Sequence, residues 1–323
     1  MRRRGFLFVG MALTARAGGQ VPEGWRQEWP LGYDGSRLAL EIREAEPYAQ
    51  WRRYLAGSCE VLSDRALERT ELEPLMTAFA SVNPAVRRIP IGLTGERRSA
   101  SRLRARLFSD GEAYLAAGGA PGTVGVYNGR QDETVMLSSA LFGEEKGRKR
   151  DDGDRFDVFV HEVTHHVLRG WRGRLPAWFS EGFSEFMAVA HFRPGLFDFG
   201  RTEVQIPRHI GRFLLPTGGL FDLPPLAEVT RLSSADWMRA NHPDEADNYA
   251  KYAAALLLLE WWLRRKPGGT AEVRQYLTEL RGLRRGGPHV AEPWGDHDDL
   301  GAIQPRLVAF WRRNGLRIRF SSA

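Results

Sequence analysis

The sequence contains very little cysteine and very little lysine. Cys59 is the single cysteine among 323 residues, which excludes an intrachain disulfide and a zinc cluster held by thiolates. A metal site in this chain would have to be built from histidine, aspartate and glutamate. Lysine supplies four of the 46 basic residues, and the arginines are scattered along expected helices instead of forming a basic block. The formal charge of +6 therefore does not predict a nucleic-acid partner.

The sequence also lacks an apolar run long enough to cross a membrane. The longest apolar stretch, residues 252–263 (YAAALLLLEWWL), is interrupted by Glu260 and is expected to form a buried helix. No later segment approaches the 18 or so unbroken apolar residues that a spanning helix needs. We therefore expect no stable membrane span in the mature protein.

Residues 1–19 have the order of parts that is typical of a secretory signal peptide. Three arginines at residues 2–4 precede a short apolar run at 5–13 and the small-x-small cleavage pattern of residues 15–17. The arginine pair followed by Gly-Phe-Leu also resembles the twin-arginine export motif. A frayed basic N-terminus is the alternative. We expect a bacterial protein that is exported, either periplasmic or extracellular.

The rest of the chain divides into a strand-rich half and a helical half. Residues 20–99 are expected to be mainly helical, because the stretch 44–67 has apolar positions at mixed spacings of three and four. No role is assigned to that region. Residues 100–323 are expected to form the main domain, with strands and one motif-bearing helix in 100–170 and a helical lobe in 171–323. This order predicts an α+β fold with two lobes.

Local patterns place individual elements in the first part of this domain. Residues 102–108 (RLRARLF) alternate between basic and apolar, as a half-buried strand does. Asp110 is expected to cap a short helix that continues to Ala117. Residues 124–127 and 134–137 are expected to be the arms of a hairpin, with Asn-Gly at the turn.

Two helices are expected to follow in close order. The first runs from about residue 155 to 168 and is stopped by Gly170, and the second starts at Pro176, a favoured first-turn residue. A connection rich in proline and glycine, residues 194–225, separates them from the remaining elements. Three further helices are expected at 248–265, 271–283 and 304–313.

Residues 161–165 (HEVTH) place the pattern HExxH on the first of these helices. Histidines four positions apart are separated by about 400°, or about 40° after one full turn, so both imidazoles project from one face. They can converge on one tetrahedral metal ion. Glu162 lies beside His161, close enough to contact a metal-bound water as general base. His166 projects about 100° away from His165 and is expected to be a partly exposed histidine outside the metal site.

The second helix supplies the carboxylate that such a site needs. A catalytic zinc takes three protein ligands and keeps one open position, and Glu181 would complete a set with His161 and His165. Glu185 lies one turn further along and could accept the remaining N–H of a zinc-bound histidine. Both carboxylates are on an otherwise apolar helix, where they would be costly without partners.

This pattern resembles the gluzincin metallopeptidases, whose second helix typically reads W-x-x-E-G-x-x-E; residues 178–185 read WFSEGFSE. A closer likeness, over roughly residues 100–265, is to the bacterial peptidase-MA-like metallopeptidases. They similarly show a strand and short helix (RLRARLFSDGEAYL), a GVY hairpin and a tyrosine that opens a later apolar helix. The resemblance implies a two-lobed zincin-like fold, with a small mixed sheet and the active-site helix in the N-terminal lobe and a mainly helical C-terminal lobe. The chain lacks the Gly-x-Met-Glu-Asn stretch of aminopeptidases in this clan, so amino-terminal trimming is not expected.

The resemblance implies roles for two further parts of the chain. Gluzincins generally place a tyrosine or histidine opposite the general base, where it donates a hydrogen bond to the oxyanion. Tyr249 is the candidate by its place in the motif, with Tyr252 in reserve. Either could equally be a core tyrosine whose hydroxyl is satisfied. Strand 134–138 could be an edge strand that pairs with an extended peptide, as in thermolysin-like relatives, or an ordinary sheet strand.

These observations predict an exported zinc-dependent hydrolase, a metallopeptidase that cleaves peptide bonds in a peptide or protein substrate. The expected Zn²⁺ ligands are His161, His165 and Glu181. Glu162 is the expected general base, and Tyr249 the expected oxyanion donor. One alternative is a catalytically inactive metallopeptidase-like binding or scaffold protein, and another is a polar core network with no metal. Three further histidines are expected to be structural or on the surface: His191, His209 and His242.

Overall fold

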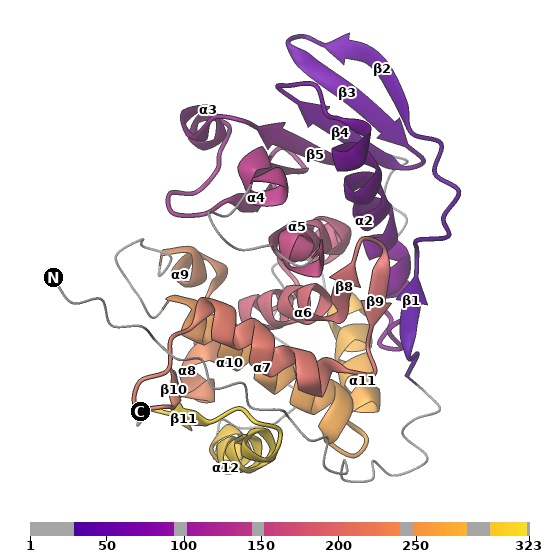
Figure 1. Ribbon diagram of the computed structural model, residues 1–323. Helices are drawn as coiled ribbons and strands as arrows, with labels where there is room; N and C mark the ends of the chain where they lie inside the picture. The colour runs from indigo at the N-terminus through magenta and orange to yellow at the C-terminus, as the bar shows by residue number, and fades with distance from the viewer. Residues whose placement is uncertain (1–28, 94–101, 144–151, 240–247, 283–297, 322–323) are drawn as a thin grey trace, which may run out of the picture.

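The computed structural model describes residues 29–93, 102–143, 152–239, 248–282 and 298–321 (Figure 1). The signal peptide predicted at residues 1–19 and His242 lie outside these ranges. The strands are β1 (Gly32–Asp34), β2 (Arg43–Tyr48), β3 (Trp51–Ala56), β4 (Cys59–Ser63), β5 (Leu103–Phe108), β6 (Gly125–Asn128), β7 (Glu133–Leu137), β8 (His191–Arg193), β9 (Leu196–Asp198), β10 (Phe221–Leu223) and β11 (Ile318–Phe320). The helices are α2 (Arg69–Arg88), α3 (Gly111–Ala116), α4 (Ser138–Phe142), α5 (Asp152–Val167), α6 (Ala177–Ala190), α7 (Thr202–Phe213), α8 (Leu226–Arg231), α9 (Ser234–Arg239), α10 (Asn248–Glu260), α11 (Gly269–Gly282) and α12 (Asp298–Arg313), with short helical segments η1 (Leu168–Trp171) and η2 (Trp261–Arg265).

Six strands form a mixed sheet in the order β2-β3-β4-β5-β7-β6. The first three are antiparallel neighbours, β4, β5 and β7 run parallel, and β6 returns antiparallel to β7. Parallel neighbours require a crossover connection, and α2 lies in the one between β4 and β5. The α+β fold class is therefore confirmed: a mixed sheet is followed by a mainly helical remainder (Figure 1).

The helical prediction for residues 20–99 is wrong over its central part. Residues 43–63 form the antiparallel strands β2, β3 and β4, and α2 is the one helix in the described part of that region. All five residues of β4 are buried, so the strand shows no alternation of apolar and polar positions. The sheet also crosses the boundary predicted at residue 100, because β4 pairs with β5.

The charged side chains in these strands pair with residues on neighbouring strands, and the sequence alone does not show this pairing. Glu60 on β4 is buried, and the Nε atoms of Arg53 and Arg104 on the two neighbouring strands lie 2.6 and 2.8 Å from its carboxylate oxygens. A buried carboxylate is tolerated when it is paired in this way. The ladder that makes this possible is not visible in a single strand's sequence.

The elements predicted for residues 102–137 are confirmed. β5 covers Leu103–Phe108, and the side chain of Asp110 caps α3 by accepting a hydrogen bond from the N–H of Ala113 at 2.8 Å. β6 and β7 form the expected antiparallel hairpin. Of the two alternatives for residues 134–138, the structure shows the ordinary sheet strand and not the edge strand. β7 lies between β5 and β6, so β6 is the outer strand on this side of the sheet.

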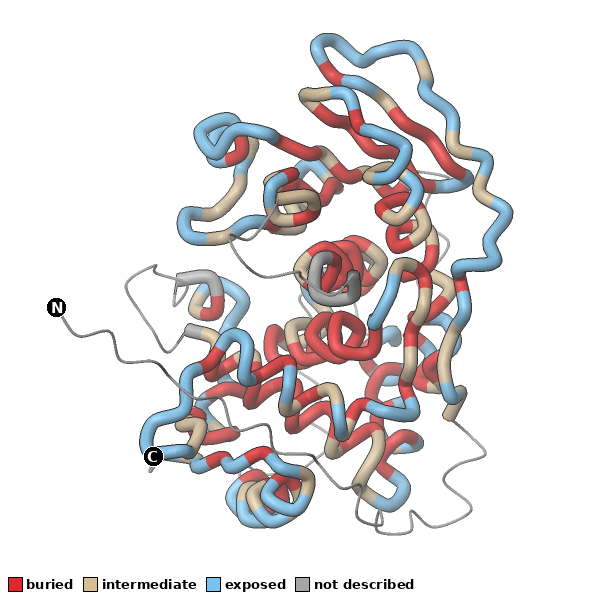
Figure 2. The backbone as a smooth tube through the Cα atoms, viewed as in Figure 1, coloured by how far each residue is buried: buried red, intermediate tan, exposed pale blue. Residues whose placement is uncertain are grey.

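The helices at the centre of the molecule are those that the sequence placed next to each other. α5 packs between the sheet with α2 on one side and α6 on the other, and α10 packs against the far side of α6 (Figure 1). Figure 2 shows that the buried residues concentrate in this central region. The three helices expected after residue 225 are confirmed as α10, α11 and α12. Within the described part of the chain, no helix combines the length and apolar character of a membrane-spanning segment.

The connection at residues 194–225 is more ordered than its composition suggested. It contains β9, which pairs with β8 and β1, and the helix α7. Proline at 207 and glycine at 211 obscured this helix in the sequence. Ile206, His209 and Ile210 nevertheless recur at helical spacing and are buried.

Gly182 allows a close approach of α6 and α10. A Cβ atom at this position would lie 2.7 Å from the carbonyl oxygen of Ala255 on α10. That distance is well inside van der Waals contact, and the obstacle is backbone that cannot rotate away. The glycine that follows Glu181 is therefore required by helix packing.

Candidate metal centre and active-site cleft

Helix α5 holds the two motif histidines on one face, between rows of fully buried apolar residues. Phe159, Val160 and Val163 are 0% exposed and anchor the helix against its neighbours. Phe159 packs edge to face against Phe79 of α2, with 5.4 Å between ring centroids. This packing fixes the rotation of α5 about its axis, and with it the direction of both imidazoles.

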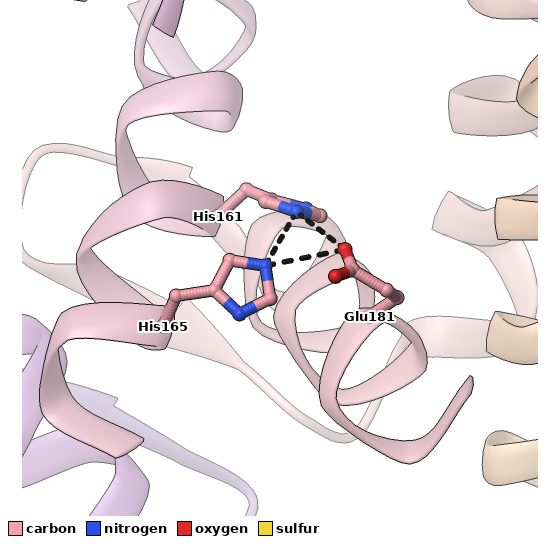
Figure 3. A group of neighbouring side chains, drawn as sticks. All are labelled: His161, His165 and Glu181. Atoms are coloured by element: carbon pink, nitrogen blue, oxygen red, sulfur yellow. Dashed lines mark hydrogen bonds and ion pairs between the residues drawn. The ribbon is translucent and has the colours of Figure 1, made fainter. Parts of the chain in front are cut away.

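His161, His165 and Glu181 meet at one point (Figure 3). The Nε2 atoms of the two histidines are 3.1 Å apart, and the Oε2 atom of Glu181 lies 3.2 Å from that of His165 and 3.4 Å from that of His161. Among the residues that the structure describes, this is the one group of three or more such side chains close enough to hold a metal ion. The predicted set of ligands is thus brought together by α5 and α6.

The spacing of these three atoms fits a tetrahedral zinc ion. Ligand atoms about 2.0–2.1 Å from a tetrahedral Zn²⁺ lie about 3.3 Å from one another, and the three observed distances are 3.1, 3.2 and 3.4 Å. Two imidazole nitrogens and one carboxylate oxygen are also a donor set that zinc accepts. The residues present therefore fit a zinc site with one position left for water or substrate.

Each of the two candidate ligand histidines has a partner on its other ring nitrogen. Nδ1 of His161 lies 3.0 Å from Oε1 of Glu185, and Nδ1 of His165 lies 3.2 Å from the hydroxyl of Ser180. A proton on Nδ1 satisfies both contacts and leaves the Nε2 lone pair free for a metal. The position predicted for Glu185 is confirmed in geometry, and Ser180 is a partner that the sequence reading missed.

The electrostatics of the cluster favour positive charge at its centre. Burial raises the pKa of Glu181, but the neighbouring His165 and His161 outweigh it and lower the pKa to about 2. Burial is likewise outweighed at Glu185, whose pKa is lowered by hydrogen bonds from His161 and His209. For His161, burial disfavours the charged form, yet Glu181 and Glu185 raise its pKa well above the ordinary value. Ionised carboxylates that draw a cation between them are what a divalent metal site requires.

Glu162 is oriented by the outer strand of the sheet. Its Oε2 atom accepts a hydrogen bond from the backbone N–H of Tyr127 on β6, at 2.6 Å. Successive residues of a strand point their N–H and C=O groups to opposite edges. The backbone groups of Gly125 therefore face the same side of β6 as the N–H of Tyr127, toward α5.

A cleft opens in front of the metal ligands. A hollow of about 380 Å³ is lined by both histidines, Glu162, Glu181 and backbone of β6. A second hollow of about 290 Å³ continues from it toward α7. The walls that the two hollows share include His161, Glu162 and Tyr252. An extended chain lying along β6 would pass directly over these side chains.

The two candidate tyrosines, Tyr249 and Tyr252, have different surroundings. The Tyr249 hydroxyl donates a hydrogen bond to Oε2 of Glu185 at 2.7 Å, and Tyr249 lines only the second hollow. Its hydroxyl is thus committed to the carboxylate behind His161. Tyr252, one turn later on α10, lines both hollows, and its ring centroid is 6.2 Å from that of His161. The structure brings Tyr252, the reserve candidate, closer to the reacting position.

Among the other described histidines, His166 is more deeply buried than expected, and His191 and His209 are structural, one of the two expected outcomes. His166 is fully buried rather than partly exposed, because its ring stacks on Tyr127 at 5.0 Å and its Nε2 lies 3.4 Å from Asp132. Burial lowers its pKa, opposed by Asp132. His191 is a core residue whose burial lowers its pKa to about 4. His209 is also buried, and it contacts Glu185.

The sequence analysis missed two residues beside the candidate metal centre, Ser180 and His209, and only Ser180 carried a signal in the sequence. Ser180 directly precedes Glu181, so its placement on the side of His165 could have been inferred from the helical phase of α6. His209 lies on α7, a helix that was not expected, and nothing in its local pattern pointed to Glu185.

No protein-family model matches the chain, and comparison with curated proteins gives no significant match. Function therefore has to be inferred from the geometry of this site.

Proposed function

We propose that the protein is a zinc-dependent hydrolase, a metallopeptidase of the gluzincin type with the two-lobed zincin-like arrangement. The observation that carries this proposal is the meeting of His161, His165 and Glu181 at tetrahedral spacing, with Glu162 beside them in an open cleft. His161, His165 and Glu181 would hold Zn²⁺, which when bound lowers the pKa of a coordinated water and polarises a carbonyl group.

The chain's own residues divide the remaining work. The carboxylate of Glu162 takes a proton from the attacking water and later delivers it to the leaving amine. The N–H of Tyr127 holds that carboxylate at the cleft. Tyr252 is the residue best placed to donate a hydrogen bond to the oxyanion, because it lines the cleft on both sides of His161 and Glu162.

An extended peptide is the substrate that this cleft suits best. β6 offers strand backbone facing α5, and an extended peptide can add to such an edge through main-chain hydrogen bonds. Residues 1–19, which lie outside the described ranges, supply the basis for proposing that the protein acts outside the bacterial cytoplasm.

The decisive test compares wild type with Glu162→Gln on a mixed peptide library, with zinc content measured for both. Glu162→Gln keeps the shape of the site but removes the base, so cleavage should fall about 10²–10⁴-fold while zinc is retained. Glu279→Gln, the same change on an exposed part of α11, is the matched control and should cleave normally.

The other outcomes separate the alternatives. Zinc bound by wild type with no cleavage of any peptide would support a scaffold or binding protein and reject the hydrolase. A purified protein that neither contains zinc nor binds added zinc would show that this cluster is a polar core network without a metal.

A further inference from the structure

We infer that His209 and Tyr249 are positioning residues for the metal centre: they clamp Glu185 from two helices and so fix His161 as a zinc ligand. This inference rests on the proposed zinc site, and it assigns a role to α7 and α10 that neither the motif nor the spacing of ligands indicates. The network involves side chains from four helices, α5, α6, α7 and α10.

Glu185 is held at both carboxylate oxygens. Oε1 faces Nδ1 of His161 at 3.0 Å, and Oε2 accepts from both Nε2 of His209 and the hydroxyl of Tyr249, each at 2.7 Å. The Glu185 side chain is 9% exposed. A buried carboxylate with donors on both oxygens cannot rotate without breaking a hydrogen bond to a charged group.

The protonation of His209 follows from its other neighbour. The guanidinium of Arg212 lies 2.8 Å from Nδ1 of His209, and a guanidinium can only donate. Nδ1 also lies 3.5 Å from Oδ2 of Asp157. In the neutral ring Nδ1 accepts from Arg212 and the proton is on Nε2, and in the charged ring both nitrogens carry protons. In both forms Nε2–H points at Glu185. His209 is 3% exposed, so water does not compete for these contacts.

The chain of contacts returns to the helix that carries the ligands. Arg212 also pairs with Asp157, a buried carboxylate on α5 about one turn before His161. Glu185, His209 and Asp157 thus link α6 and α7 back to α5. In this network the carboxylates of Glu185 and Asp157 carry two negative charges and Arg212 carries one positive charge. The net charge of the buried network is therefore small before a metal is added.

Tyr249 and Tyr252 stack on each other, with ring centroids 6.0 Å apart and planes 10° apart. This arrangement nevertheless gives the two tyrosines different roles. Tyr252 faces the cleft, where it can act on substrate. Tyr249 reaches behind His161, where it acts on Glu185. The two tyrosines should therefore fail in different ways when each loses its hydroxyl.

The test measures zinc affinity by competition with a chelator, together with kcat and KM on a cleaved peptide. Tyr249→Phe and His209→Leu should each weaken zinc binding on the order of tenfold, the lower end of the range for partners of metal ligands. Their kcat with saturating zinc should stay near wild type. His209→Gln restores a donor near the position of Nε2 and should recover most of the affinity. Tyr252→Phe should lower kcat and leave zinc affinity unchanged.

His191→Leu is the matched control, because His191 is also a buried histidine but contacts neither Glu185 nor the ligands among the described residues. It should bind zinc as wild type does. Equal zinc affinity of wild type, Tyr249→Phe and His209→Leu would overturn the inference. A fall in kcat at unchanged affinity in Tyr249→Phe would return that tyrosine to the oxyanion role. Failure of wild type itself to bind zinc would reject the proposed function instead.

Discussion

His161 and His165 belong to one motif and face one point, yet the protein supports them very differently. His161 is backed by the Glu185 carboxylate, which is itself held by donors from two more helices. His165 is backed by the single hydroxyl of Ser180 at 3.2 Å. The first histidine is fixed by charge and by a buried network, and the second by one neutral hydrogen bond. A shared motif therefore does not imply equal support, and the difference is measurable.

Removing either imidazole should have the largest effect on zinc affinity. The two variants should not differ from each other in zinc binding. His161→Ala and His165→Ala each delete a ligand, so both should lose more than the roughly 10–100-fold in affinity that loss of an outer partner costs. The metal-free proteins should still differ. His161→Ala leaves Oε1 of the buried Glu185 without its partner and should lower the free energy of unfolding by about 1–3 kcal/mol, and His165→Ala should cost less. Urea unfolding without metal gives the comparison, and equal losses would contradict it.

Changing the partners instead of the ligands should sharpen the contrast. Glu185→Gln is expected to weaken zinc binding by about 10–100-fold, since a neutral amide no longer strengthens the donor character of His161. Ser180→Ala removes one neutral hydrogen bond worth about 1 kcal/mol and should weaken binding about fivefold. Chelator competition on both variants provides the measurement. A larger effect at Ser180 than at Glu185 would reverse the assignment of the strongly supported side.

The pH dependence of zinc binding should come mainly from His161. Burial disfavours its charge, but Glu181 and Glu185 raise its pKa in the metal-free protein. A raised folded-state pKa stabilises the metal-free fold fully below the ordinary histidine pKa of about 6.5, and this contribution is lost as pH rises through the folded value. Zinc needs the neutral ring, so protons should compete with zinc as pH falls from the raised pKa of His161 through the neutral range.

Glu181, with a pKa of about 2, stays ionised over that range and adds nothing to the slope. Glu185→Gln removes a group that supports the imidazolium, so its zinc affinity should fall less steeply with pH than that of wild type. Titrations of both proteins at several pH values test this expectation. Parallel curves would show that another group sets the slope.

The smallest effect on zinc is expected at the third neighbouring histidine. His166→Phe keeps a ring against Tyr127 and removes the contact with Asp132, so stability should drop by about 1 kcal/mol. Zinc affinity should remain within about twofold of wild type, because this side chain points away from the ligands. Tyr127 on β6 contacts both His166 and Glu162. A large loss of zinc affinity would therefore show that the position of β6 affects metal binding.

The convergence of the three candidate ligands could be predicted from sequence because it depends on helical geometry and one short connection. Four residues of an α-helix fix the relation of His161 to His165, and a short connection returns Glu181 against the same helix. Glu185 follows from the next turn of α6. These distances do not depend on how the rest of the chain is assembled.

The parts that could not be predicted depend on contacts between distant segments. The strands at 43–63 are defined by pairing, and Glu60 is tolerated there because Arg104, 44 residues away, reaches it. Tyr249 and Tyr252 lie one turn apart on α10. The rotation of that helix in the assembled fold decides which of them contacts Glu185 and which lines both hollows. His209 belongs to a helix that contains proline and glycine, so its contribution required the assembled fold.

Gly182 has a consequence for the chemistry that its place next to Glu181 does not suggest. Because no methyl group stands at this position, the backbone of α10 can approach α6 to the distance at which Ala255 would touch a Cβ. The tyrosine-bearing helix and the ligand-bearing helix are thereby kept at a fixed separation. The side chain missing at Gly182 therefore sets how closely Tyr249 and Tyr252 on α10 approach Glu181 and Glu185 on α6.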